Sequence, residues 1–133
     1  MSCFWDGILH QLRIHFSEFL EKEKIKNIKE LIIFLQSKNT KNINVKWNNI
    51  PTFTEKQLEE NYIHIKEYNI KSVYNGYLCS TCDPFLILIS EILKVDIIHN
   101  YCQNIIKYIH INNNKKKNKI LRFHSNRSHF SSS

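Results

Sequence analysis

The segment from Asp83 to Lys94, with the sequence DPFLILISEILK, constrains the fold of this chain more than any other stretch. Asp83 is a favourable N-cap for a helix, and Pro84 suits the first helical position. Residues 85–89 are apolar without interruption. A helix that is apolar all round is stable in water only when other elements cover it. The sequence therefore predicts a fully buried helix.

Three β-like segments follow this helix, at residues 95–101, 104–111 and 119–125. Residues 129–133 are a candidate for a short final strand. In the third segment, alternation predicts that the even-numbered residues from Ile120 share one face and the odd-numbered residues the other. The Asn- and Lys-rich connection before it is interpreted as a solvated hairpin loop, so we expect the strands to form a meander.

The N-terminal half is predicted to be helical. Apolar residues recur with the helical period over residues 4–22 and again over Asn27–Gln36. Thr52 and Glu55 have the spacing of a capping box, which predicts a third helix that runs to about Tyr68.

Helices followed by a run of strands are typical of the α+β class. We expect a small β-sheet flanked by helices, with loops at residues 37–51 and 69–81. The length suits a single domain of residues 1–133 with one ordinary hydrophobic core.

The composition limits the class of protein and its partners. With 42% hydrophobic and 12% aromatic residues, the chain is too apolar to be disordered. The formal net charge is +7, but 21 Ile, 16 Asn, 16 Lys and no Ala are the bias of an AT-rich genome, such as that of a large DNA virus. The lysines are scattered apart from Lys115–Lys117 and Lys119, so a nucleic-acid partner is not favoured.

The sequence predicts no membrane segment and no secretory signal. The longest apolar run, Phe85–Ile89, is far shorter than the roughly 18 residues that a membrane-spanning helix needs. The N-terminus lacks a basic segment followed by an apolar stretch. We therefore expect an intracellular, cytoplasmic protein whose cysteines are free thiols. Without a phosphate-binding or dinucleotide-binding glycine motif, no cofactor is expected.

Cys3 and His129 are the candidate catalytic residues. In cysteine hydrolases the nucleophile is a thiolate, which is favoured at the N-terminus of a helix and by a histidine within hydrogen-bonding reach. Cys3 stands at the start of the first predicted helix, where the helix dipole favours an anion. His129 stands at the start of the last predicted strand, and a strand packed beside that helix would bring the two together.

Four stretches, taken together, resemble the ovarian-tumour (OTU) family of cysteine proteases, most of which remove ubiquitin. CFWDGILHQL resembles the family's nucleophile segment, and NIKELIIFLQ its second helix. YLCSTCDPFLILISEILKVDIIHNY resembles its loop, acidic residue, apolar helix and strand. KILRFHSNRSHF resembles the strand and turn that lead to its catalytic histidine. The resemblance spans nearly the whole chain and implies an OTU-like α+β domain of the papain-like cysteine protease kind.

The resemblance also implies the chemistry. Cys3 would be the nucleophile, and His129 would be the general base that then protonates the leaving amine. Backbone N–H groups at the helix start would hold the oxyanion. The substrate would be a conjugate of ubiquitin or a ubiquitin-like protein. Family members commonly have Asp or Asn two residues after the histidine to orient it; this chain has Ser131 there, with Asn126 and Asp6 as alternatives.

A second hypothesis is an inactive OTU-like module that binds a ubiquitin-like or acidic partner. Only Met1 and Ser2 precede Cys3, at the place where the family has a loop that contributes to its oxyanion hole. Such a module would keep the fold and lose the thiol chemistry.

A third hypothesis is a small zinc-stabilised nucleic-acid-binding protein. Cys79, Cys82, His99 and Cys102 have a spacing found in structural zinc sites. The residues between them predict a buried helix and a strand, which is a poor context for a zinc module, so no metal is expected. The other histidines are expected at the surface or half-buried: His10, His15, His64, His110 and His124.

Overall fold

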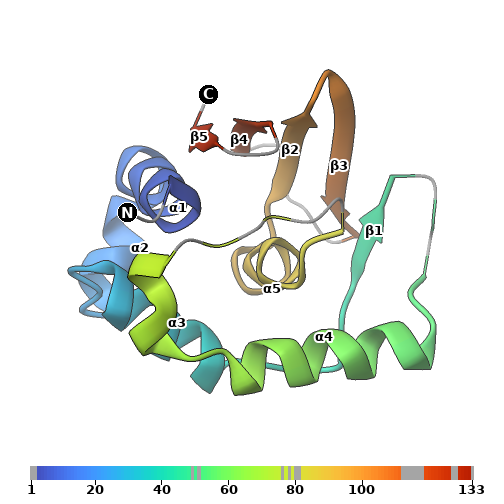
Figure 1. The fold of residues 1–133 in the computed structure, drawn as a ribbon, viewed down its shortest axis with the longest axis horizontal. Helices are drawn as coiled ribbons and strands as arrows, with labels where there is room; N and C mark the ends of the chain where they lie inside the picture. Colours follow the sequence, from blue (N-terminus) through green and yellow to red (C-terminus); the bar gives the residue numbers. More distant parts are fainter. Residues whose placement is uncertain are drawn as a thin grey trace.

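The computed structural model describes residues 3–48, 50, 52–75, 77, 79, 82–111, 119–126 and 129–132. They form an α+β fold in which helices lie on one side of a small mixed five-stranded sheet (Figure 1). The helices are α1 (Cys3–His15), α2 (Ser17–Lys22), α3 (Ile28–Ser37), α4 (Glu55–Glu67), the 3-10 helix η1 (Ile70–Asn75) and α5 (Pro84–Leu93). The strands are β1 (Val45–Trp47), β2 (Asp96–Tyr101), β3 (Asn104–His110), β4 (Ile120–Ser125) and β5 (Phe130–Ser132).

The strand order in the sheet is β1-β3-β2-β4-β5. β2 pairs in parallel with β4, and the other neighbouring pairs are antiparallel. The three predicted strands are therefore confirmed as β2, β3 and β4, and the candidate final strand forms as β5. The predicted meander is wrong, because β2 lies between β3 and β4 and these two strands form no hairpin. The Lys-rich loop falls on residues 112–118, which lie outside the described residues.

The predicted buried helix is confirmed as α5. The Asp83 carboxylate accepts hydrogen bonds from the backbone N–H groups of Phe85 and Leu86, at 2.9 and 3.3 Å, and so caps the helix. Residues 85–90 are all buried. α5 lies between the sheet, where it packs against β1, β2 and β3, and helices α3 and α4 (Figure 1). Its apolar circumference is therefore covered on every side.

The first predicted helix is interrupted, whereas the second forms as expected. α1 ends at His15 and α2 begins at Ser17, because Phe16 has a non-helical backbone with φ −137° and ψ 39°. α3 is capped by Asn27, whose side chain accepts a hydrogen bond from the N–H of Glu30 at 2.9 Å.

The third predicted helix forms, but its capping box lies two residues later than expected. The hydroxyl of Thr54 accepts from the N–H of Gln57 at 3.1 Å, and Gln57 Oε1 accepts from the N–H of Thr54 at 2.8 Å. The assignment of the capping box to Thr52 and Glu55 is wrong. Thr52–Glu55 and Thr54–Gln57 have the same spacing, so spacing alone does not decide between the two pairs. The later register leaves Phe53 just before the cap, where it packs against the core.

Two elements lie where loops are expected. β1 pairs antiparallel with β3, and η1 follows α4. Both are too short to show a period in the sequence. No helix in the described part of the chain combines the length and apolar character needed to cross a membrane.

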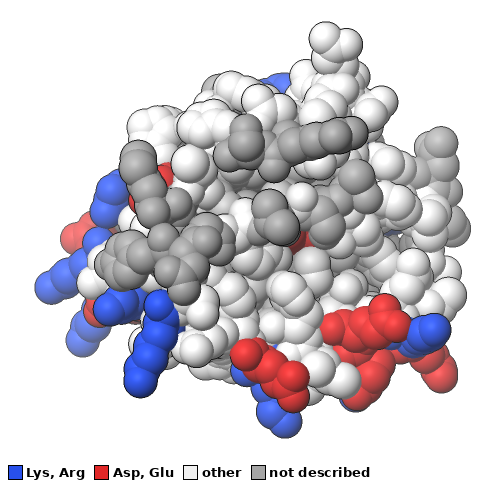
Figure 2. Space-filling model, viewed as in Figure 1, with Lys and Arg blue, Asp and Glu red and all other residues white. Residues whose placement is uncertain are grey.

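Most charged side chains of the face shown in Figure 2 lie at its periphery. Acidic side chains gather over one end of α4, and Glu59 of this helix pairs with Lys41. Lysine and arginine side chains on the side of α2 and α3 are interspersed with acidic ones. The described part of this face carries no continuous basic surface.

Candidate functional site

Cys3 begins α1, and the residues after it anchor the helix in the core. Phe4 and Trp5 are 1% and 0% exposed, and their rings pack edge to face with centroids 5.0 Å apart. Cys3 is half-buried and carries a free thiol. The first backbone N–H groups of a helix have no carbonyl partner within it. The thiol thus lies beside donors of the kind that hold an oxyanion.

Two hydrogen bonds set the direction of α1 along the edge of the sheet. Buried Gln11 accepts, through Oε1, a bond of 3.1 Å from the backbone N–H of Arg122 in β4. One turn further along the helix, the carbonyl of His15 accepts from Lys119 Nζ at 2.8 Å. Higher-numbered helix residues therefore meet lower-numbered strand residues, so α1 runs antiparallel to β4.

Gly7 lies against β5. A Cβ atom built at this glycine would lie 3.1 Å from two ring carbons of Phe130 and 3.4 Å from the backbone N of Ser132. Glycine inside a helix is about 1 kcal/mol less favourable than alanine. The close approach of β5 is the structural reason for a glycine here.

This alignment brings Cys3 and His129 to the same end of the sheet. A helix rises about 1.5 Å per residue, so Cys3 lies about 12 Å along α1 from Gln11. A strand rises about 3.3 Å per residue, so an equal length from Arg122 reaches the end of β4, near Asn126. The N–H of Asn126 donates to the carbonyl of His129 at 2.9 Å. The helix start and the turn that leads into β5 are therefore level with each other.

The residues that follow Cys3 and His129 touch directly. Phe4 and Phe130 are both buried, and their ring centroids are 4.9 Å apart. His129 is exposed, and its backbone N–H donates to Oδ1 of Asn126 at 2.9 Å, which shapes the turn. Among the described contacts, no hydrogen bond joins the Cys3 thiol to the His129 ring. The structure brings the two predicted residues to one region but does not pair them.

Ser131 is engaged elsewhere. Its hydroxyl lies 2.7 Å from Nε2 of His124, which faces it in the β4–β5 ladder, whereas the family resemblance expects this residue to orient His129. Asn126 uses its side-chain oxygen on the backbone of His129. Asp6 lines a cavity between α1 and the start of α3.

The four cysteines differ in their environments. Burial, and then the Asp83 carboxylate, raise the pKa of Cys82 to about 11 and raise the pKa of Cys79 as well. Because the thiolate is the reactive form, these two are poor nucleophiles at neutral pH. Cys102 is exposed at positive φ in the two-residue turn between β2 and β3. Cys3 is the thiol at a helix start.

The residues of the zinc pattern are not assembled into a site. His99 is buried in the sheet, with Nε2 2.7 Å from the hydroxyl of Ser125, whereas Cys102 is exposed in the turn. Within the described residues, no three His, Cys, Asp or Glu side chains are grouped so that they could hold a metal ion. The positions of these side chains do not support the zinc hypothesis.

His99 is instead a buried neutral residue of the core. It is 0% exposed, and its ring centroid lies 5.4 Å from that of Phe130. In the described part of the chain its Nδ1 has no hydrogen-bond partner. Burial lowers the pKa of His99 to about 4, so the ring is neutral at pH 7.

No protein-family model, curated protein or solved structure matches this chain. The α+β class is confirmed by the fold, whereas membership of the OTU family stays a prediction. Function is therefore inferred from the positions of the chain's own residues.

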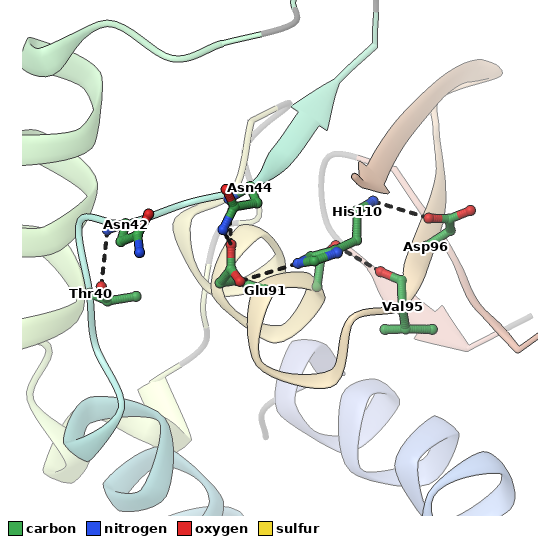
Figure 3. Close-up of polar contacts among 8 residues, drawn as sticks. Thr40, Asn42, Asn44, Glu91, Val95, Asp96 and His110 are labelled. Carbon is green, nitrogen blue, oxygen red and sulfur yellow. Dashed lines mark hydrogen bonds and ion pairs between the residues drawn. The ribbon is translucent and has the colours of Figure 1, made fainter. Parts of the chain in front are cut away.

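A polar cluster near the opposite edge of the sheet from Cys3 and His129 links α5 to β1 and β3 (Figure 3). Glu91 accepts hydrogen bonds from the backbone N–H and the side-chain amide of Asn44, and its Oε2 lies 3.2 Å from Nε2 of His110. Asp96 Oδ1 accepts from the backbone N–H of His110 at 3.1 Å. The expectation that His110 lies at the surface or half-buried is wrong, since it is 2% exposed. We interpret this cluster, at the β1 side of the sheet, as a structural link.

Gly7 and Gln11 are the residues of the site region that sequence reasoning missed. A signal for Gly7 exists, because glycine in a helical pattern often marks a close packing contact. Gln11 gives no signal. A polar residue on an amphipathic helix is expected to face solvent, whereas Gln11 is 3% exposed and meets the edge of β4.

Proposed function

We propose that this chain is an OTU-like, cysteine-dependent isopeptidase that hydrolyses conjugates of ubiquitin or a ubiquitin-like protein through Cys3 and His129. The observation that carries the proposal is the 4.9 Å ring contact of Phe4 with Phe130, because these residues directly follow the proposed pair. It supports a thiol at a helix start beside a histidine at a strand start, which is what a Cys–His hydrolase needs. The ubiquitin-like substrate comes from the family resemblance.

In this proposal the Cys3 sulfur attacks the carbonyl carbon of the isopeptide bond, and His129 takes up the thiol proton. Backbone N–H groups at the start of α1 hold the oxyanion that forms. When the intermediate collapses, the C–N bond breaks and His129 gives its proton to the leaving amine. Water then hydrolyses the thioester and releases Cys3.

The exposed position of His129 sets one requirement. Its ring has to turn toward Cys3 when substrate binds, and catalytic hydrogen bonds often tighten only in the complex. The local structure is compatible with this rotation of the ring. Asn126 holds only the backbone of His129, through two hydrogen bonds of 2.9 Å. The backbone is fixed while the ring lies at the surface.

A second candidate is an inactive OTU-like module that binds a ubiquitin-like or acidic partner. The bond of 2.7 Å between Ser131 and His124 favours it, because it engages the side chain expected to orient His129. In that case the fold is kept and Cys3 has no special reactivity.

The test is the reaction of purified protein with ubiquitin that carries a C-terminal electrophile, followed by mass mapping of the adduct. The isopeptidase proposal predicts an adduct on Cys3 that is lost in Cys3→Ala and slowed about a hundredfold in His129→Ala. Cys102→Ala and His10→Ala remove an exposed thiol and an exposed imidazole and should react like the wild type. Folded protein that forms no adduct would favour the inactive module, and an adduct on Cys102 would refute Cys3 as the nucleophile.

A further inference from the structure

We infer that Gly7 is a positioning residue for the proposed thiol site, because its missing side chain sets the spacing between α1 and β5. The inference rests on the proposed function. A Cβ atom at Gly7 would lie 3.1 Å from Cδ1 and Cε1 of Phe130 and 3.4 Å from the backbone N of Ser132. Carbon atoms in favourable contact are about 3.5–4.0 Å apart. A methyl group at this position therefore requires the ring of Phe130, or the backbone that carries it, to give by a few tenths of an ångström.

The ring of Phe130 has little room to yield. It stacks on Phe123 with centroids 5.0 Å apart and packs against Phe4 at 4.9 Å and His99 at 5.4 Å. Only 5% of Phe130 is exposed. Because protein interiors are close-packed, the displacement passes from this ring to the backbone that carries it.

β5 is the element that gives way. It has three residues and, within the described sheet, pairs with β4 alone. α1 buries a continuous apolar face and is bonded to β4 through Gln11. His129 directly precedes β5 and shifts with it against the two hydrogen bonds that tie its backbone to Asn126, whereas Cys3 stays with α1. A methyl group at Gly7 therefore separates the two residues of the proposed pair.

A double-mutant cycle between Gly7 and His129 tests the inference. The rate of adduct formation with the ubiquitin electrophile is measured for the wild type, Gly7→Ala, His129→Ala and the double variant. We expect Gly7→Ala to slow the reaction about tenfold, since a misplacement of about 1 Å can cost about a hundredfold and the displacement here is smaller. His129→Ala should cost about a hundredfold in the wild type but only about tenfold in the Gly7→Ala background, because the double variant should react about as slowly as His129→Ala alone. Equal losses in both backgrounds would overturn the inference and leave the proposed function standing.

Rescue separates positioning from loss of stability. Phe130→Leu in the Gly7→Ala background removes the ring carbons that the methyl group meets and should restore the rate about fivefold or more. His10→Ala, on the exposed side of α1, controls for the effect of alanine on the helix and should react as the wild type does. A Gly7→Ala protein that Phe130→Leu slows further would contradict the inference.

Hydrogen exchange decides the question even if the wild type forms no adduct. Gly7→Ala should speed exchange of the β5 amides relative to those of β2 and β3, and Phe130→Leu should reverse the change. Unchanged protection of β5 would overturn the role of Gly7 whatever the chemistry. Selective loss of protection in β5, without an adduct in the wild type, would support Gly7 as the spacer and refute only the proposed function.

Discussion

The hydroxyl of Ser131 in β5 lies 2.7 Å from Nε2 of His124 in β4. The two residues face each other in the antiparallel ladder, so strand register creates the bond. In the family that the sequence resembles, the residue at this position orients the catalytic histidine. Here the hydroxyl is bonded to His124 of the neighbouring strand, so it does not orient the ring of the proposed base His129.

We expect Ser131→Ala to change the rate of adduct formation on Cys3 by less than about twofold, far below the hundredfold or more that a positioned acid or base contributes. The reason is that the hydroxyl is already bonded to His124. The rate with the ubiquitin electrophile checks this. A loss as large as that caused by His129→Ala would mean that Ser131 turns to His129 in the complex.

The buried ring of His99 predicts that stability depends on pH. Burial lowers its pKa in the folded protein to about 4, from an ordinary value of 6.5. As the pH falls from 6.5, the unfolded chain binds a proton while the folded chain does not. The free energy of unfolding should therefore fall between pH 6.5 and pH 4, and this group should add no further change outside that range.

His99→Gln isolates that contribution, because glutamine keeps a polar group near Ser125 but does not titrate. Between about pH 7.5 and about pH 4.5, the wild type should lose about 1–3 kcal/mol more unfolding free energy than the variant. Urea unfolding at the two pH values measures the loss. His10→Gln, at an exposed histidine, should behave as the wild type does. Equal losses in wild type and His99→Gln would show that His99 takes up its proton without cost.

Removal of the Glu91 carboxylate should destabilise the fold. Glu91→Ala takes away the acceptor of the Asn44 N–H and the partner of His110 Nε2, and we expect a loss of about 2–4 kcal/mol. Glu91→Gln keeps an acceptor for Asn44 and should lose less. The exposed Glu60→Ala serves as control and should change stability by no more than about 0.5 kcal/mol. Urea unfolding curves give these values, and an unaltered midpoint in Glu91→Ala would contradict the structural role.

Cys82 should resist alkylation in the folded protein. With a pKa of about 11, about one Cys82 thiol in a thousand is ionised at about pH 8. Iodoacetamide should therefore modify the exposed Cys102 about a hundredfold faster than Cys82, and labelling of Cys82 should accelerate as the pH rises toward 11. Peptide mass mapping follows each site, and urea should abolish the difference. Equal rates in folded protein would contradict the buried setting of Cys82.

Elements with local signals are the ones that the sequence predicts well. Asp83 and Pro84 predict the start of α5, because helix capping depends only on residues within a few positions of one another. The alternation of residues along 120–125 likewise predicts the two faces of β4, because it too is a local pattern. Signals of this kind fail when two registers compete, as they do for the capping box of α4, or when an element is as short as β1.

Relationships between distant residues are not readable in the same way. The parallel pairing of β2 with β4, and the partner of Ser131, depend on which strands become neighbours in the packed sheet. The burial of Gln11 depends on an edge formed by Arg122, far along the chain. Cys3 and His129 were therefore predictable as reactive residue types at element starts, whereas the spacing that Gly7 sets between their elements was not.

The hydrogen bond between Gln11 and Arg122 joins residues 111 positions apart. This separation sets how long α1 waits for its partner strands during synthesis. During synthesis α1 emerges well before the strands it packs against. At about 5–20 residues per second, the ribosome takes roughly 6–20 s to make the residues between them. Throughout that interval the apolar face of α1 is without the strands β4 and β5, so it stays open to other apolar surfaces until the chain's own strands are made.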